Sequence, residues 1–285
     1  MRASSGGSAT YISASSRGAW SCSTTDHERR LFDPAYLRFQ YGDDERLRIR
    51  IETHERYSEN RELFMPWVLR QVEARPGQCL LDVGCGPGQY HEHLRHIRVI
   101  AVDTQPGMLA KVNVPKVQAD TQALPFADRS FERVMSNHVL YHVPDRAQAL
   151  REMRRVVKPG GRAVITTNAS DSLRTLFDLY NEAARECGAP EDRTVGARFS
   201  LDGPDAELVR AVFPGARIEL YRDAFLFRET EPVLAYVASG APSALPDDVR
   251  APVLAGLERR VRAIIEREGV FRVPKTAGCF VADVA

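Results

Sequence analysis

The sequence predicts an α/β fold in which a doubly wound, Rossmann-like sheet is covered by helices. Three observations lead to this prediction. Apolar runs alternate with amphipathic stretches, which is the order expected of parallel strands connected by helices. The run Leu80–Val83 enters a glycine-rich turn at 84–88, and glycines let such a turn approach a ligand closely. A second apolar run ends at Asp103, an acid that could accept hydrogen bonds from a ribose diol.

The elements of the sheet follow one another through the first part of the chain. A helical stretch over 44–73 comes first, and Pro66 is expected to kink or divide it because proline has no amide hydrogen to donate. A helix over 145–157 is expected to end at Lys158-Pro-Gly-Gly, which permits a reversal into the next strand. The predicted strands are 79–83, 98–102, 115–119, 132–136 and 162–167.

After Thr167 the regular alternation gives way to longer helices and irregular segments. A helix over 170–187 is followed by a polar stretch to about residue 204 and then by a short helix. The remaining predicted elements are a strand over 216–227, helices over 231–238 and 246–268, and a final strand within 271–284.

Composition limits the classes of function. The chain has 285 residues, of which 44% are hydrophobic, and a formal charge of +1, so there is little electrostatic reason to expect a nucleic-acid partner. No apolar run approaches the ~18 residues of a membrane span, so no membrane association is expected. The five cysteines are odd in number and include no Cys-x-x-Cys pair, as expected of reduced thiols in a cytoplasm.

The N-terminal segment differs from the rest of the chain. Residues 1–25 are rich in serine, threonine and glycine and contain no acid, which predicts a mobile leader. Tyr11 and Trp20 favour the alternative that the segment folds over a site or over a neighbouring subunit in a homo-oligomer.

The spacing of the glycines distinguishes between classes of nucleotide. The glycines at 84, 86 and 88 do not follow the Gly-x-Gly-x-x-Gly pattern of dinucleotide-binding turns. Pro87 also stands where a phosphate cradle would need a free amide. The pattern therefore favours a nucleoside without a pyrophosphate, while a plain strand-to-helix turn remains the alternative for the glycines alone.

Asp82-Val-Gly-Cys-Gly-Pro-Gly resembles motif I of the class I S-adenosylmethionine (SAM)-dependent methyltransferases, and Asp103 resembles their ribose-binding acid. Residues 48–58 and 136–145 are similar to the small-molecule subgroup related to the ubiquinone and menaquinone methyltransferases. The resemblance implies SAM as cofactor, S-adenosylhomocysteine (SAH) as its product, and a seven-stranded sheet whose last strand inserts antiparallel. The regions expected are a leader or lid at 1–43, a SAM-binding core at 44–169, a substrate cap at 170–215, and the end of the sheet with further cap helices at 216–285.

The resemblance also assigns the cofactor contacts. Asp103 would bind the ribose and Asp120 the adenine amino group, although Asp120 could instead cap a turn. Asp82 would lie near the methionyl ammonium, and Met108 would form a wall beside the adenine ring. The expected cofactor-binding residues are Asp82, Gly84, Gly86, Asp103, Thr104, Met108, Asp120, Thr121, Asn137 and His138.

The acceptor side is assigned more loosely. His142 is the candidate general base because an imidazole titrates near neutral pH, and the alternative is a structural or capping histidine. Tyr57 and His54 could face the site or pack in the core. No metal is expected, since His91, His93 and His96 lack the i, i+4 spacing of a helical ligand pair. The expected acceptor contacts are Tyr57, Asn168, Arg174, Tyr180 and Phe199.

These expectations describe a cytoplasmic methyltransferase that acts on a hydrophobic bacterial small molecule such as a phenol, an indole or a terpenoid, at oxygen, nitrogen or carbon. The alternatives are a C-methyltransferase of quinone biosynthesis and a SAM-binding protein that does not transfer methyl groups. The acceptor itself is not encoded in any motif of the sequence.

Overall fold

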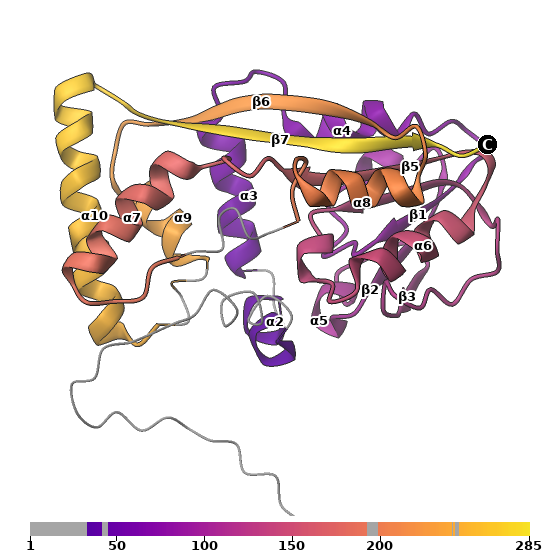
Figure 1. The fold of residues 1–285 in the computed structure, drawn as a ribbon, viewed down its shortest axis with the longest axis horizontal. Helices are drawn as coiled ribbons and strands as arrows, with labels where there is room; N and C mark the ends of the chain where they lie inside the picture. The colour runs from indigo at the N-terminus through magenta and orange to yellow at the C-terminus, as the bar shows by residue number, and fades with distance from the viewer. Residues whose placement is uncertain (1–32, 42–44, 193–198, 241, 243–244) are drawn as a thin grey trace, which may run out of the picture.

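A computed structural model describes residues 33–41, 45–192, 199–240, 242 and 245–285. Their centre is a seven-stranded sheet with the order β3-β2-β1-β4-β5-β7-β6 (Figure 1). The strands β1 to β5 are parallel to one another, whereas β7 lies between β5 and β6 and runs antiparallel to both. The strands are β1 (Cys79–Val83), β2 (Arg98–Asp103), β3 (Lys116–Gln118), β4 (Phe131–Asn137), β5 (Val157–Asn168), β6 (Arg217–Phe227) and β7 (Phe271–Asp283).

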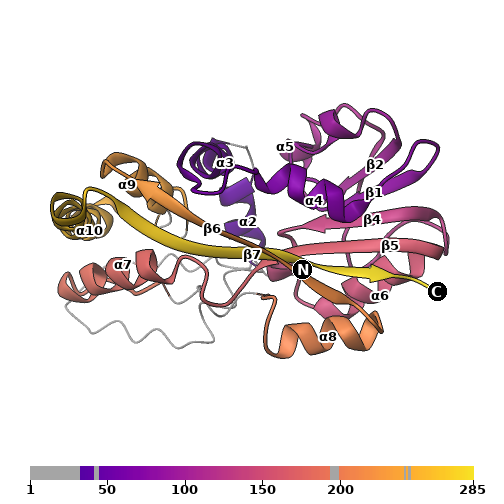
Figure 2. The same ribbon diagram turned by 90° about the horizontal axis from the view of Figure 1, so that it is seen from above.

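The predicted seven-stranded sheet with an antiparallel last strand is confirmed, and helices cover both of its faces (Figure 2). The helices are α2 (Pro34–Tyr41), α3 (Glu45–Tyr57), α4 (Phe64–Val72), α5 (Pro106–Leu109), α6 (Arg146–Val156), α7 (Arg174–Glu186), α8 (Pro204–Val212), α9 (Glu231–Ala238) and α10 (Asp247–Glu268), with single 3-10 turns η1 (His91–Leu94) and η2 (Leu140–His142).

Alternating side chains divide the core between the two faces of the sheet. Leu81 and Val134 pack with α6 and α8, whereas Leu80 and Met135 pack with α4 and η1. This is the period of two expected of strands that are covered on both faces. The arrangement places the carboxyl ends of β1, β2 and β4 at one edge, where doubly wound sheets bind their ligands.

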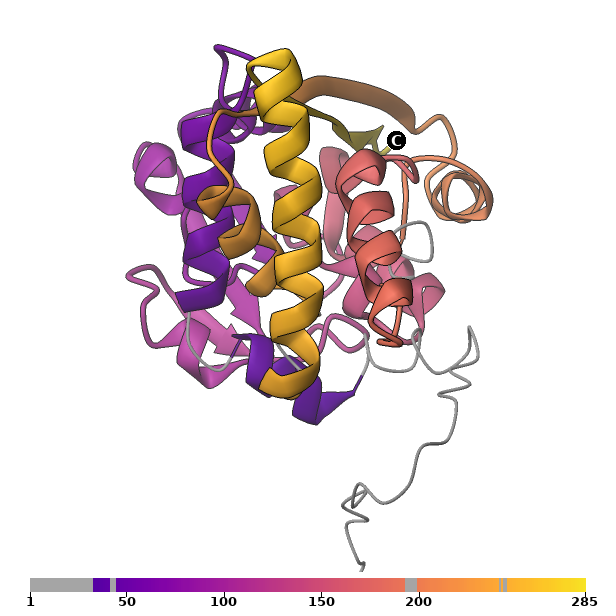
Figure 3. The ribbon, with the colours of Figure 1, turned by 90° about the vertical axis from the view of Figure 1, so that its left-hand side faces the viewer.

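The far halves of β6 and β7 extend beyond the other strands and carry a second apolar cluster. Phe225, Phe227 and Phe271 from these strands pack with Tyr180 of α7 and Leu257 of α10. Around this extension α7 packs against α10, whereas α3 packs against α9 and β6 (Figure 3). We call this part, formed by 45–57, 174–186, 223–238 and 247–275, the cap region.

Two predicted elements differ from the structure. The helix expected over 44–73 is two helices, and the break lies at 58–63 rather than at Pro66, which is accommodated in the first turn of α4. The break is held by β6, because the Asn60 amide donates to Asp223 Oδ1 at 2.9 Å. The strand expected over 162–167 begins earlier, at Val157, directly after α6.

Residues 170–215, which were expected to form one cap, lie in two places. Helix α7 packs against α10 in the cap region, whereas α8 packs against α6 on the sheet. Within the segment expected to be a leader or lid, residues 1–32 and 42–43, including Tyr11 and Trp20, lie outside the described residues, and residues 34–41 form α2. No helix among the described residues is long and apolar enough to cross a membrane.

Candidate functional site

The turn after β1 requires glycine for two separate reasons. Gly84, Gly86 and Gly88 have φ angles of +72°, +54° and +82°, in the left-handed region that other residues rarely adopt. At Gly84 there is also no room, since a Cβ would lie 2.3 Å from a methyl carbon of Val139. The turn therefore packs directly against the segment that follows β4.

Asp103 connects this turn to the end of β2. Its Oδ2 accepts from the Gly86 amide at 2.9 Å and its Oδ1 from the Gln105 amide at 2.8 Å. Burial raises the pKa of Asp103, and the backbone hydrogen bonds oppose that rise. Each carboxylate oxygen has a second lone pair, so both can accept from a ribose hydroxyl without losing their amides.

Asp82 forms a buried pair that the sequence did not reveal. The carboxyl group is almost fully buried in β1, and its Oδ2 lies 3.0 Å from His91 Nε2. Burial raises the pKa of Asp82, and the hydrogen bond from His91 opposes that rise. No spacing rule links the two residues, because η1 brings His91 under the glycine turn only in the folded chain.

The end of β4 combines backbone strain with unused polar atoms. His138 has a φ of +57°, which is uncommon outside glycine and typical of functional sites. Among the described residues, the side-chain atoms Asp82 Oδ1, Gln89 Oε1, Ser136 Oγ and Asn137 Nδ2 are buried without a hydrogen-bond partner. Buried polar groups normally have partners. These donors and acceptors fit the amino-acid end of a SAM molecule.

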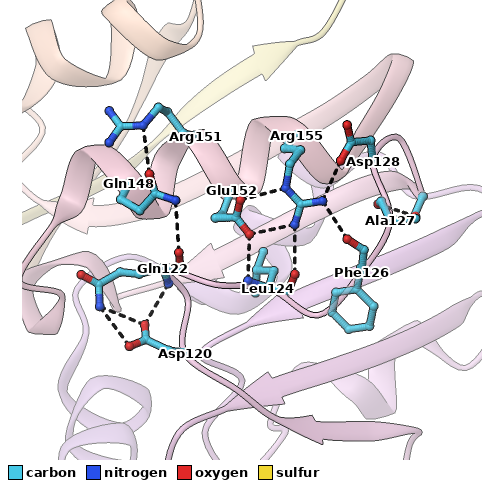
Figure 4. Close-up of polar contacts among 11 residues, drawn as sticks. Asp120, Gln122, Leu124, Phe126, Ala127, Asp128, Gln148, Arg151, Glu152 and Arg155 are labelled. Atoms are coloured by element: carbon cyan, nitrogen blue, oxygen red, sulfur yellow. Dashed lines mark hydrogen bonds and ion pairs between the residues drawn. The ribbon is translucent and has the colours of Figure 1, made fainter.

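The segment expected to bind adenine is held mainly by its own side chains and by α6 (Figure 4). Asp120 is exposed, and its carboxylate accepts from the Gln122 amide at 2.8 Å and from Gln122 Nε2 at 3.0 Å. The turn-capping role is therefore present, and a free lone pair remains for an adenine amino group. Three further residues expected around the adenine are buried, namely Thr121, Met108 and Leu124.

Two residues of α6 fix this segment, and sequence reasoning missed both. Arg155 donates to the carbonyls of Leu124 at 2.9 Å and Phe126 at 2.7 Å, while Glu152 accepts from the Leu124 amide at 2.8 Å (Figure 4). The two side chains also pair with each other at 2.7 Å. An Arg–Glu pair at i, i+3 on a helix resembles an ordinary surface pair in sequence, so only the folded chain reveals this function.

His142 lies in η2 and contacts the N-terminal helix. Its Nε2 is 2.9 Å from the Tyr41 hydroxyl, and its ring packs edge-on against Tyr41 and Tyr141. The described chain thus supplies a partner for the candidate base. A role as base requires that Nε2 exchange Tyr41 for the acceptor.

The five expected acceptor contacts are not gathered in one place. Tyr180 and Phe199 are almost fully buried in two different apolar clusters, so the structure places both rings in the core. Tyr57 is half-buried against Phe227, with ring centroids 5.1 Å apart, and Arg174 is exposed at the start of α7. Asn168 lies at the end of β5, beside the edge where the cofactor is expected.

Residues 81–165 match the family model described as a methyltransferase domain. The chain is 36% identical over 146 residues to malonyl-[acyl-carrier protein] O-methyltransferase of Pseudescherichia vulneris, which covers 49% of this chain and 55% of that protein. It is 35% identical over 117 residues to demethylmenaquinone methyltransferase of Corynebacterium efficiens, with coverages of 39% and 51%. The chain thus spans about half the length of these relatives.

The fold is also found among solved structures. A protein of Anabaena variabilis that is ascribed to the methyltransferases of an antibiotic biosynthesis pathway superposes with a TM-score of 0.58 at 18% identity, over 76% of this chain and 95% of that one. At this identity the likeness concerns the fold. The glycine turn, the acid at the end of β2 and the match of residues 81–165 to a methyltransferase domain agree with one another, and together they support a class I SAM-dependent methyltransferase.

Proposed function

We propose that this protein transfers the methyl group of SAM to a hydrophobic small molecule. The principal support is the Asp103 carboxylate, which the Gly86 and Gln105 amides hold at the ligand edge of the sheet, beside a turn that has no room for a side chain at Gly84. Methyl transfer from a sulfonium is an in-line displacement, so holding the acceptor atom in line with the methyl group supplies much of the catalysis.

In this proposal the candidate site residues have separate roles in binding SAM and in binding the acceptor. Asp103 binds the ribose, Asp120 and Thr121 the adenine, and Gly84, Gly86, Asn137 and His138 line the methionyl end. Thr104 and Met108 complete the cofactor wall, and Asn168 and Tyr57 lie on the acceptor side. His142 serves as base for acceptors that must lose a proton, once Tyr41 has released its Nε2.

Calorimetric titration with SAH tests the donor half of this proposal. The parent protein should bind SAH, and Asp103→Ala should weaken binding by roughly tenfold or more because two charge-assisted hydrogen bonds to the ribose are lost. Asp248→Ala, which alters an exposed carboxylate in the first turn of α10, is the matched control. Equal affinity of parent and Asp103→Ala for SAH would refute the assignment.

The likeness to demethylmenaquinone methyltransferase favours quinone-pathway C-methylation as a second candidate. Incubation with radiolabelled SAM and a panel of phenols, indoles, terpenoids and a demethylmenaquinone analogue separates the two. Product from the quinone analogue alone would select the second candidate. Product from phenols or indoles would select the first.

A further inference from the structure

We call the glycine turn at 84–88, together with the ends of β2 and β4, the donor region. A buried ion pair in the cap region lies outside it. Lys275 on β7 lies with its Nζ 2.8 Å from Asp223 Oδ2 on β6, and both residues are less than a tenth exposed. The ammonium group also donates to Ser58 Oγ at 2.8 Å and lies 2.9 Å from His54 Nδ1, both on α3. The ammonium group thus contacts three polar side chains.

The two charges of this pair hold each other in the ionised state. Although burial opposes it, the hydrogen bonds from Lys275 and the Asn60 amide keep the pKa of Asp223 below its ordinary value. Burial lowers the pKa of Lys275, and Asp223 opposes that shift. The face of the Phe225 ring, 4.1 Å from Nζ, also favours the cation.

This pair determines which nitrogen of His54 carries the proton. An ammonium group can only donate, so Nδ1 accepts and the ring proton is on Nε2. Burial, and next the charge of Lys275, hold the pKa of His54 well below 6.5, which keeps the ring neutral at pH 7. His54 is therefore a fixed N–H donor whose other nitrogen is bound to a cation.

His54 Nε2 forms no hydrogen bond with the described part of the chain, and it is not among the side-chain atoms enclosed without a partner. Its surroundings are aromatic, with the centroids of Phe225 and Tyr236 at 4.7 Å and 5.9 Å from that of His54. A single polar donor among aromatic rings is typical of a small-molecule site.

The cluster lies beside the edge where the methyl donor is expected. On the strand that carries Lys275, Ala277 pairs with Asn168 at the end of β5. Lys275 precedes Thr276, whose carbonyl accepts from the Ala169 amide directly after the end of β5. In the sheet, β4 and β5 thus lie between β1, which leads into the glycine turn, and β7, which carries Lys275.

We propose that His54, supported by the Lys275–Asp223 ion pair, binds the reacting oxygen of the acceptor and selects phenols and enols. This inference rests on the proposed methyl transfer. A donor backed by a cation binds an oxyanion more strongly than a neutral oxygen, so it favours the ionised nucleophile. A protonated amine would instead meet the N–H group of a ring whose other nitrogen is bound to a cation.

No group then has to accept a proton while the oxygen attacks the methyl group. The phenol loses its proton to His142 or to water as it binds, and the resulting phenolate oxygen attacks the methyl carbon. The C–O bond forms as the C–S bond breaks, and the sulfur of SAH keeps the bonding electron pair. His54 remains neutral throughout and acts by positioning and stabilising the oxygen.

Binding of 4-nitrophenol to the protein saturated with SAH tests the proposal without turnover, because the phenolate absorbs visible light and the phenol does not. The bound phenol should ionise at a lower pH than the free phenol. In His54→Phe this shift should be lost and the affinity should fall by roughly 10- to 100-fold. His54→Gln, whose amide can donate from the same place, should recover most of both effects.

Further variants separate this function from folding. The double variant Lys275→Met/Asp223→Asn removes both charges, keeps an acceptor for the Asn60 amide, and should lose the ionisation shift. Ser58→Ala leaves His54 and the ion pair in place and serves as the control. SAH affinity should remain within about twofold in all variants, which shows that the donor region is folded.

The outcomes distinguish the two proposals. Failure of the parent protein to bind SAH would overturn the methyltransferase function itself. Normal SAH binding with no ionisation shift for 4-nitrophenol up to millimolar concentration, or an equal shift in His54→Phe, would overturn the oxygen site alone. Methylation of 4-nitroaniline at a rate equal to that of 4-nitrophenol would overturn the selection of oxygen.

Discussion

The donor region and the cap region assemble their polar groups in opposite ways. In the donor region, Asp103 Oδ2 accepts from the Gly86 amide only 17 residues away, and much of the expected binding surface is backbone. In the cap region, Lys275 meets His54 across 221 residues, and all four polar partners are side chains. A site made of backbone turns leaves a local pattern in the sequence, whereas a site made of distant side chains does not.

The two regions also differ in how a substitution should affect the rest of the fold. The donor turn is a tight backbone arrangement packed against Val139, so its geometry and the core depend on each other. The cap region has its own apolar cluster around Phe225 and Leu257, so packing there can change while the edge of the parallel strands stays intact. The following predictions test this separation, beginning with the largest expected effect.

Gly84→Ala should abolish SAH binding and lower the free energy of unfolding by about 3 kcal/mol, because it adds backbone strain and an overpacked methyl group. Gly77→Ala is the matched control, since Gly77 also has a positive φ of +87° but no atom within 4 Å of the added Cβ. Urea denaturation should show a loss of only about 1 kcal/mol in the control. Equal losses would mean that contact with Val139 is unimportant.

Arg155→Ala should lower the free energy of unfolding by about 2 to 3 kcal/mol and weaken SAH binding about tenfold, because the carbonyls of Leu124 and Phe126 lose their donor. The control is Arg151→Ala, because the side chain of Arg151 bonds only to Gln148 among the described residues. This variant should change neither the free energy of unfolding nor the SAH affinity appreciably. Titration calorimetry and urea denaturation measure both. An unchanged SAH affinity in Arg155→Ala would show that the adenine segment holds its shape unaided.

Gly256→Leu should separate α10 from α7, because even a Cβ at this position lies 3.0 Å from the Cβ of Ala183. The expected loss is about 2 kcal/mol of stability from overpacking. SAH affinity should stay within about twofold, since the donor turn is in the other region. A large loss of SAH binding in this folded variant would contradict the independence of the two regions.

The stability of the parent protein should fall from pH 7.5 to 5.5 by about 1.4 kcal/mol more than that of His54→Gln. The pKa of His54 is lowered in the folded state, chiefly by burial and then by the charges of Lys275, His138 and Arg50. Its stabilising contribution is therefore present above the unfolded value of ~6.5 and lost as the pH falls below it. Parallel urea titrations at the two pH values measure the difference, and identical pH dependence would contradict a neutral His54.

Particular residues show how far sequence reasoning reached. The strand boundaries at 79–83 were predicted correctly, because an apolar run that ends in a glycine turn is a local signal. The inserted antiparallel strand was also predicted correctly, but from the resemblance to the class I methyltransferases. The roles of Asp103 and Asp120 remain predictions whose geometry the structure makes possible. The choice of Tyr180 and Phe199 as acceptor contacts relied on aromatic composition alone, and composition does not distinguish a site wall from a buried core.

The sequence by itself determined the doubly wound sheet, the edge at which the methyl donor is expected and the glycine turn, because backbone conformation and strand alternation are encoded within a few neighbouring residues. Only the tertiary structure decided that His91 pairs with Asp82, that Arg155 holds the adenine segment, and that Lys275, Asp223 and His54 meet in the cap region. Each of these contacts joins separate elements, and its strength depends on a burial that no single segment possesses before the chain has folded.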